Sequence, residues 1–147
     1  MAATAPDCTP LPPWTSLLGR RLIDLLGWRL IDARPDEGWI RVGFDGKQDF
    51  CNAGGFVQGG LLSAMLDSTM SAAVFAMTLG KLYPPTISMT VNFLAPALPG
   101  PISGEARVTQ LGKSVAFVEG RLTADNGTLL ATASTSVRLV EVAKAMR

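Results

Sequence analysis

One segment constrains the fold more than any other: the 21 residues Gly59–Leu79 are apolar on nearly every side and carry a single charge, Asp67. Small Ser, Ala and Thr side chains are mixed with the large apolar ones. A helix of this composition is expected to be buried on all sides, as the core of a domain. A membrane span is the competing interpretation for a segment of this length. The central carboxylate, and the amphipathic strands predicted elsewhere, favour the core helix.

After Pro84-Pro85 the hydrophobic period changes from helical to two. Apolar residues at 87, 89, 91 and 93 alternate with polar ones, which predicts a strand with one buried face. An Asp125-Asn126-Gly127 hairpin signal and a Gly112-Lys113 turn then separate three further predicted strands, 103–111, 114–124 and 128–139. Small residues on single strand faces would let a helix approach closely: Gly104, Ala106, Ala131 and Ala133.

The amino-terminal part is less regular. Residues 1–13 contain four prolines and are expected to form a loose lead-in. Helical spacing of apolar residues predicts a helix over 14–26, followed by strands over 28–33 and 39–44 and a loop over 45–58. The whole order predicts an α+β fold, an antiparallel sheet wrapped around one central helix, with 14–147 as a single domain.

Composition excludes several function classes. The sequence has no histidine, so Ser-His-Asp and Cys-His nucleophiles and the usual histidine zinc sites are absent. A net charge of +1 gives no electrostatic footprint for nucleic acid. The two cysteines form no disulfide framework, which fits a reducing compartment, and the start of the sequence has no secretion signal. These features predict a cytoplasmic location. Hydrophobic residues reach 48% and charged ones only 17%, so an extra buried face, such as a subunit interface, is expected.

Two features of the long helix point to chemistry. Asp67 is the only charge between Phe50 and Gly80, and lone buried carboxylates cluster at functional sites, although a hydrogen-bonded structural role is the simpler alternative. Gly59 and Gly60 open the same helix, where free N–H groups and the helix dipole favour a developing negative charge. That is the geometry of an oxyanion hole, and a plain glycine-rich helix start is its alternative.

The ordered residues resemble a known family. They are Asn52-Ala-Gly-Gly-Phe-Val-Gln58-Gly59-Gly60, then Asp67, Thr86 and Asn92-Phe-Leu-Ala-Pro96. This set is similar to the hotdog-fold acyl-CoA thioesterases, in particular the phenylacetate-degradation branch with its pattern N-x-x-G-x-x-H-G-G followed by Asp and a T…P strand. The resemblance covers roughly residues 15–140.

The resemblance implies hydrolysis of an acyl-CoA with no metal and no cofactor beyond the CoA of the substrate. It makes Asp67 the nucleophile or general base and gives the oxyanion role to the Gly59 N–H. Asn52 would help to place water or substrate, and Thr86 would lie near the reacting centre. Gly60 and Lys113 are the residues expected to meet the CoA part. The apolar residues Phe56, Met65, Met70, Phe75 and Phe93 fit an acyl pocket and fit core packing equally well.

One departure concerns the histidine of the family pattern, which is Gln58 here. Glutamine donates and accepts hydrogen bonds but cannot carry a proton near neutral pH. We expect a positioning role for Gln58, with Asp67 as the only acid–base group; a loop-packing role is the alternative. The substitution also keeps open a non-catalytic acyl-CoA or lipid-binding protein. A dehydratase or hydratase of the same fold typically needs histidine and is disfavoured.

Helix geometry adds an expectation about assembly. Gly59 and Asp67 are eight residues apart, which is about 12 Å along a helix. One thioester carbon cannot be within about 3 Å of both in one chain. A two-fold dimer with antiparallel central helices would bring Gly59 of one chain beside Asp67 of the other. The family forms such dimers, often paired into tetramers, so a homodimer and a dimer of dimers are predicted.

Overall fold

The computed structural model describes residues 10–146. The elements follow one another as η1 (Pro13–Leu18), α1 (Arg20–Leu26), β1 (Arg29–Arg34), η2 (Pro35–Glu37), β2 (Trp39–Gly46), η3 (Gln48–Phe50), α2 (Gly59–Met77), β3 (Leu82–Tyr83), β4 (Thr86–Phe93), β5 (Gly100–Leu111), β6 (Val115–Ala124), β7 (Leu129–Arg138), β8 (Val140–Glu141) and α3 (Val142–Ala145).

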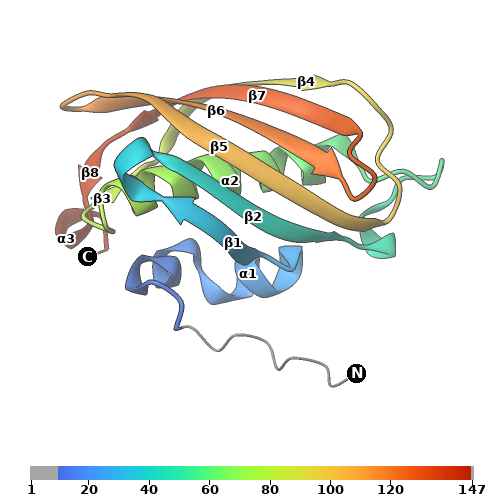
Figure 1. The fold of residues 1–147 in the computed structure, drawn as a ribbon, viewed down its shortest axis with the longest axis horizontal. Coiled ribbons are helices and arrows are strands. Elements are labelled where there is room, and N and C mark those ends of the chain that lie inside the picture. The colour runs from blue at the N-terminus through green and yellow to red at the C-terminus, as the bar shows by residue number, and fades with distance from the viewer. Residues whose placement is uncertain (1–9, 147) are drawn as a thin grey trace.

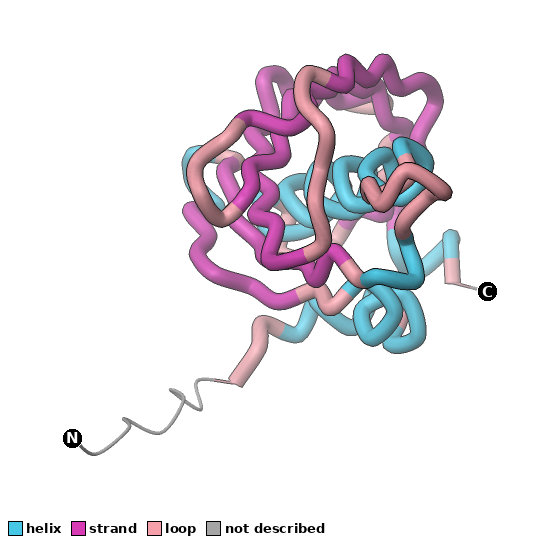
Figure 2. Tube along the Cα trace, turned by 90° about the vertical axis from the view of Figure 1, so that its right-hand side faces the viewer, coloured by secondary structure: helices cyan, strands magenta, loops and turns pink. Residues whose placement is uncertain are grey.

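A six-stranded antiparallel sheet wraps around α2. Its strand order is β1-β2-β5-β6-β7-β4, so β4, the first strand of this sheet after α2, returns to the far edge beside β7. Figure 1 shows α2 lying behind the curved sheet, and the turned view in Figure 2 shows the strands curving around it. The predicted architecture, an antiparallel sheet around a long central helix, is confirmed.

Small residues at the centre of the sheet let α2 approach it. A Cβ atom added to Gly104 on β5 would lie 2.5 Å from the Thr69 hydroxyl oxygen of α2. A Cβ atom on Gly120 of β6 would lie 2.9 Å from Met70. Both contacts are closer than real Cβ atoms permit, so glycine is required at these positions for the observed packing. The sequence-based expectation of a close helix approach at Gly104 is confirmed.

Several predicted boundaries were wrong. The single helix expected over 14–26 is broken at Gly19, whose φ of +85° ends η1 before α1 begins. The long helix ends at Met77 and not at residue 79, because Leu79 and Gly80 both adopt positive φ. The strand pair β3–β8 was not predicted, since two residues leave no period to detect. Residues 1–9 of the expected lead-in lie outside the described residues.

The composition of the central helix predicted that it is buried on all sides. That prediction was wrong, because one side of the helix is not fully covered. Apart from Leu61, its incompletely buried positions between residues 60 and 71 fall on one stripe, because the sheet covers the opposite faces. The stripe carries small side chains around the one charge: Gly60, Ser63, Ala64, Asp67 and Ser71. Asp67 itself is half-buried. By length and composition α2 could cross a membrane, and 61% of its most apolar window is buried inside the chain, as in a core helix.

The two sheet edges differ in character. The β1 edge is interrupted by a bulge between Leu30 and Asp32 and carries charged side chains, which are features that prevent strand addition. The β4 edge also has a register shift, between Thr86 and Ser88, but its eight residues, TISMTVNF, include no charge and no proline. Ile87 and Phe93 on β4 are 58% and 53% exposed. The second edge is therefore a bare, uncharged strand with exposed apolar side chains, of the kind that pairs with another chain.

Candidate active site

The centre of the candidate site is a hydrogen bond between α2 and the start of β4. The Thr86 hydroxyl donates to Oδ1 of Asp67 at 2.6 Å. Thr86 is held in place by the first β4–β7 pair, opposite Val137, and the preceding Pro85 carbonyl accepts the Arg138 N–H at 2.8 Å. One carboxylate oxygen is thus fixed by a neutral donor, and the pair leaves Oδ2 without a hydrogen-bond donor among the described residues.

This pair faces a cavity of about 340 Å³. Its floor is the uncovered stripe of α2, one wall comes from η1 and α1, and the other comes from β3 and the residues leading into β4. The lining residues are Leu17, Leu18, Leu22, Ala64, Asp67, Ser68, Ser71, Phe75, Tyr83, Pro84, Pro85 and Thr86. Apolar walls with a few converging polar groups are typical of small-molecule sites.

The amino terminus of α2 supplies hydrogen-bond donors. The N–H groups of Gly59 and Gly60 make no hydrogen bond to any of residues 10–146, as expected in the first turn of a helix. Gly59 lines a second cavity of about 360 Å³ together with Phe56, Leu62, Phe93 and the residues 94–97. Free N–H groups at the positive end of a helix can bind an oxygen that gains negative charge.

The loop before α2 holds this helix end in place. The Asn52 side-chain oxygen accepts the N–H groups of Gly54 at 3.0 Å and Phe56 at 3.3 Å, so it closes the loop. The Gln58 N–H donates to the Phe50 carbonyl at 2.9 Å, which fixes the residue that caps the helix. The Gln58 side chain is exposed and makes no hydrogen bond within the described residues. Asn52 thus shapes the loop, and Gln58 is free to contact a ligand.

The predicted site residues form two groups in one chain. Asp67 and Thr86 share the first cavity, while Asn52, Gln58, Gly59 and Gly60 surround the start of α2. Eight residues of helix separate the groups by about 12 Å. Lys113 is exposed in the β5–β6 turn and lines neither cavity. Of the apolar candidates, Met65 and Met70 are core residues, whereas Phe75 lines the Asp67 cavity and Phe56 and Phe93 line the Gly59 cavity.

The sequence did not reveal the walls of the Asp67 cavity. Leu17, Leu18 and Leu22 were recognisable as apolar helical positions, but nothing in their spacing shows which element they face. Tyr83 was missed because β3 is too short to give a pattern. Among residues 10–146 no three His, Cys, Asp or Glu side chains are grouped as metal ligands.

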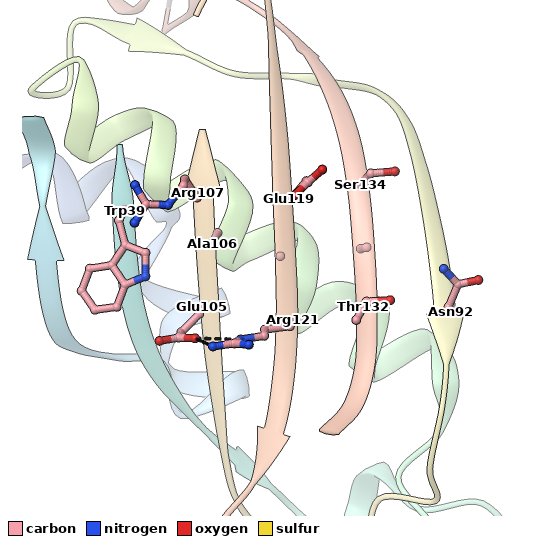
Figure 3. Close-up of a pocket in the computed structure, with 11 residues that line it drawn as sticks. Trp39, Asn92, Glu105, Ala106, Arg107, Glu119, Arg121, Thr132 and Ser134 are labelled. Atoms are coloured by element: carbon pink, nitrogen blue, oxygen red, sulfur yellow. Dashed lines mark hydrogen bonds and ion pairs between the residues drawn. The ribbon is translucent and has the colours of Figure 1, made fainter. Parts of the chain in front are cut away.

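A larger cavity, of about 590 Å³, lies on the outer face of the sheet and contains none of the predicted site residues. Figure 3 shows Trp39, Glu105, Arg107 and Arg121 on this face, with α2 behind the sheet. Glu105 accepts Arg121 at 2.5 Å and Arg41 at 2.6 Å, and its side chain is only 15% exposed. Burial by itself raises the pKa of Glu105, but the hydrogen bonds and charges of the two arginines outweigh it, so the pKa lies below its usual 4.5.

Glu105→Gln is expected to be less stable than the parent at neutral pH by about 1 kcal/mol, since the half-exposed arginines lose a charged partner. A lowered folded-state pKa contributes stability above the usual pKa, and this contribution is lost as the pH falls through the folded value. Urea unfolding at about pH 7 and about pH 3 should therefore show a difference that is smaller at the acidic pH. A difference independent of pH would mean that packing, and not the charge, stabilises this cluster.

Comparisons with known proteins identify the family of this chain. The sequence pattern of the thioesterase superfamily matches residues 54–131, which include the start of α2, Asp67 and Thr86. A candidate esterase of Thermoplasma volcanium is 32% identical over 102 residues, covering 69% of this chain and 74% of that protein.

Solved structures share the fold. A candidate thioesterase from Ralstonia eutropha, described as related to phenylacetic acid degradation, superposes with a TM-score of 0.78 at 30% identity, covering 85% of this chain and 98% of that one. The E. coli PaaI protein, from the phenylacetic acid degradation operon, gives a TM-score of 0.74 at 18% identity over 88% and 91% of the two chains. A Haemophilus influenzae thioesterase gives 0.79 at 15% identity over 92% and 94%. The resemblance seen in the sequence is confirmed, and this chain, with its hotdog fold, belongs to the thioesterase superfamily.

Proposed function

We propose that this protein hydrolyses acyl-CoA thioesters to the free acid and CoA. The observation that carries the proposal is the Asp67–Thr86 pair, which presents a carboxylate to an apolar cavity on the uncovered face of α2. A reacting carbonyl needs both an attacking group and a donor for its oxygen, and the free Gly59 N–H of a second chain would supply the donor. No metal or cofactor beyond the CoA of the substrate is part of the proposal.

The chemistry can follow two routes with the same residues. As a general base, Asp67 takes a proton from water while the water oxygen attacks the thioester carbon. As a nucleophile, Asp67 Oδ2 attacks that carbon first, and water then attacks the acyl carbon of the resulting anhydride and releases the Asp67 carboxylate. In both routes the C–S bond breaks, the sulfur leaves as thiolate and takes up a proton, and the acid keeps one oxygen from water. Thr86 positions the carboxylate by holding Oδ1.

We further propose that each site is shared between two chains of a dimer. The bare β4 edge and the small-residue stripe of α2 are adjacent uncovered surfaces, and both favour a second copy of the same chain. Suppose that two α2 helices run antiparallel and cross where Ser63 of each chain meets. A residue of one chain then lies beside the partner residue whose number, added to its own, gives about 126. Gly59 of the partner would then lie beside Asp67, and the partner's Gln58 would lie beside Ser68.

The outer sheet face is the surface we assign to pairing of two dimers. It carries opposite charges in neighbouring positions, with Glu119 next to Arg107 in the β5–β6 register, so two copies can complement each other. Light scattering of the purified protein should give the mass of a dimer or a tetramer. A monomer at micromolar concentration would contradict the shared site. The cytoplasm remains the predicted location.

Release of free thiol from a panel of acyl-CoAs tests the activity directly. Turnover of any of them supports hydrolysis. The second candidate function is a non-catalytic acyl-CoA or lipid-binding protein, and Gln58 favours it because glutamine replaces the histidine of the family pattern. Binding of acyl-CoA without thiol release, by a folded dimer, would establish that function and contradict hydrolysis.

Gln58 provides a separate prediction. Gln58→His is expected to be active, and Gln58→Ala is expected to lose about 1–3 kcal/mol of transition-state stabilisation through a lost hydrogen bond. Because the side chain makes no hydrogen bond within the described residues, the Ala variant should unfold at the same urea concentration as the parent. The ratio of kcat/KM values measures the effect. An Ala variant as fast as the parent would show that Gln58 has only a loop role.

A further inference from the structure

The Asp67 cavity is closed on one side by an amino-terminal arm that the thioesterase pattern does not include, since that pattern begins at residue 54. The arm consists of η1 and α1, Pro13–Leu26, and contributes Leu17, Leu18 and Leu22 to the lining. Figure 1 shows α1 as a separate helix beside β1, outside the sheet that wraps around α2. The shape of this wall is therefore particular to the arm and not to the matched part of the chain.

The arm is anchored at both ends. Trp14 and Thr15 of η1 are buried, and Leu26 at the end of α1 is buried as well. The Lys47 ammonium donates to the carbonyls of Asp24 at 3.2 Å and Leu25 at 2.5 Å, where a cation also favours the helix C-terminus. A fixed helix presents its side chains to the cavity in a defined position, so a change of side-chain size changes the space next to Asp67.

Leu22 is the lining residue of the arm that does not support the core. Leu17 and Leu18 pack against the core cluster, whereas Leu22 is 42% exposed and is not part of that packing. A leucine that borders the cavity but stabilises little else is available to contact a ligand. Its neighbour Leu25 is 51% exposed on the same helix and lines none of the Asp67 cavity, so it provides a matched control.

The cavity also has a direction. Its floor continues from Asp67 to Phe75, which is eight residues or about 12 Å along α2. The far end is closed by Phe75 and Tyr83, whose rings are 5.8 Å apart in a tilted arrangement. A chain whose carbonyl is held at Asp67 would extend along this floor, with the arm on one side and the segment 83–86 on the other.

We infer that Leu22 is a specificity-determining residue, and that the arm Pro13–Leu26 selects the length of the acyl chain by contacting its tail. The inference rests on the proposed function, because it takes the Asp67 cavity as the acyl site. A larger side chain at position 22 shortens the chain that fits, and a smaller one admits longer chains.

The test is a series of Leu22→Trp, Leu22→Ala and the control Leu25→Trp, assayed with acetyl-, butyryl-, hexanoyl-, octanoyl- and decanoyl-CoA. In Leu22→Trp the ratio of kcat/KM for the longest accepted chain to that for butyryl-CoA should fall at least about tenfold, because each misfitted methylene costs that much in an apolar pocket. In Leu22→Ala the preferred chain should become longer. In Leu25→Trp every ratio should stay within about twofold of the parent.

Binding separates this inference from the proposed function. S-alkyl-CoA thioethers of the same lengths cannot be hydrolysed, and their Kd values should change with position 22 in the same order. If the parent hydrolyses no acyl-CoA, the proposed hydrolysis is contradicted. A Kd that depends on residue 22 and on alkyl length would still support the Asp67 cavity as the acyl-binding site. If neither the kcat/KM ratios nor the Kd values change in folded Leu22 variants, the acyl tail does not contact the arm and the inference is wrong.

Discussion

Asp67→Asn should fold like the parent and lose at least about 100-fold in kcat, because general-base and nucleophilic roles both need the carboxylate. The shape of the side chain is kept, and an asparagine oxygen can still accept the hydrogen bond from Thr86. The melting temperature should be equal or higher, since a half-buried charge is replaced by a neutral amide. Circular dichroism and thiol release from a good acyl-CoA substrate measure the two effects.

A matched control lies one helical turn away. Ser71 lines the same cavity on the same stripe of α2, and Ser71→Ala should retain turnover within a few-fold of the parent. Thr86→Val should be intermediate, because it frees the carboxylate from its positioning hydrogen bond without removing the reactive group. Parental turnover in Asp67→Asn would exclude Asp67 from the chemistry and would favour the binding protein.

Complementation between two inactive variants is the second expected result. Gly59→Pro and Asp67→Asn should each be nearly inactive alone, and their random co-assembly should restore about one quarter of parental activity. The fraction follows because half of the dimers are mixed and each mixed dimer has one intact site. Proline is suited to position 59, since Gln58 is already extended and the Gly59 N–H makes no hydrogen bond within the described residues.

Two controls make this experiment decisive. Gly59→Ala keeps the backbone N–H and, like Gly59→Pro, adds a Cβ atom about 3.1 Å from the Phe93 ring. A loss of activity that occurs only in the proline variant is therefore due to the missing N–H donor. The double variant, co-assembled with the parent, should leave about one quarter of the activity if sites are shared and about one half if each site lies within one chain. No recovery from well-folded mixed dimers of the single variants would contradict the shared site.

The sequence alone was sufficient for the architecture. A long helix with one charge, followed by period-two strands with a hairpin signal at Asn126-Gly127, predicted the sheet around α2, because hydrophobic periodicity records which faces are buried. Gly104 indicated a close helix approach, and a Cβ atom added there would lie only 2.5 Å from the Thr69 hydroxyl oxygen. The order Gly59, Asp67, Thr86 led to the correct family, because spacing along one helix and into the next strand is itself part of the sequence.

Only the tertiary structure decided which of these residues meet. Thr86 reaches Asp67 because β4 returns to the edge of the sheet beside β7, and no local pattern specifies that return. The uncovered stripe of α2 could not be predicted, since composition describes a helix as apolar but does not show which face the sheet leaves open. The cavity walls from Leu22 and Tyr83 likewise depend on contacts between segments about 60 residues apart in sequence, and long-range packing of this kind leaves no local signal to detect.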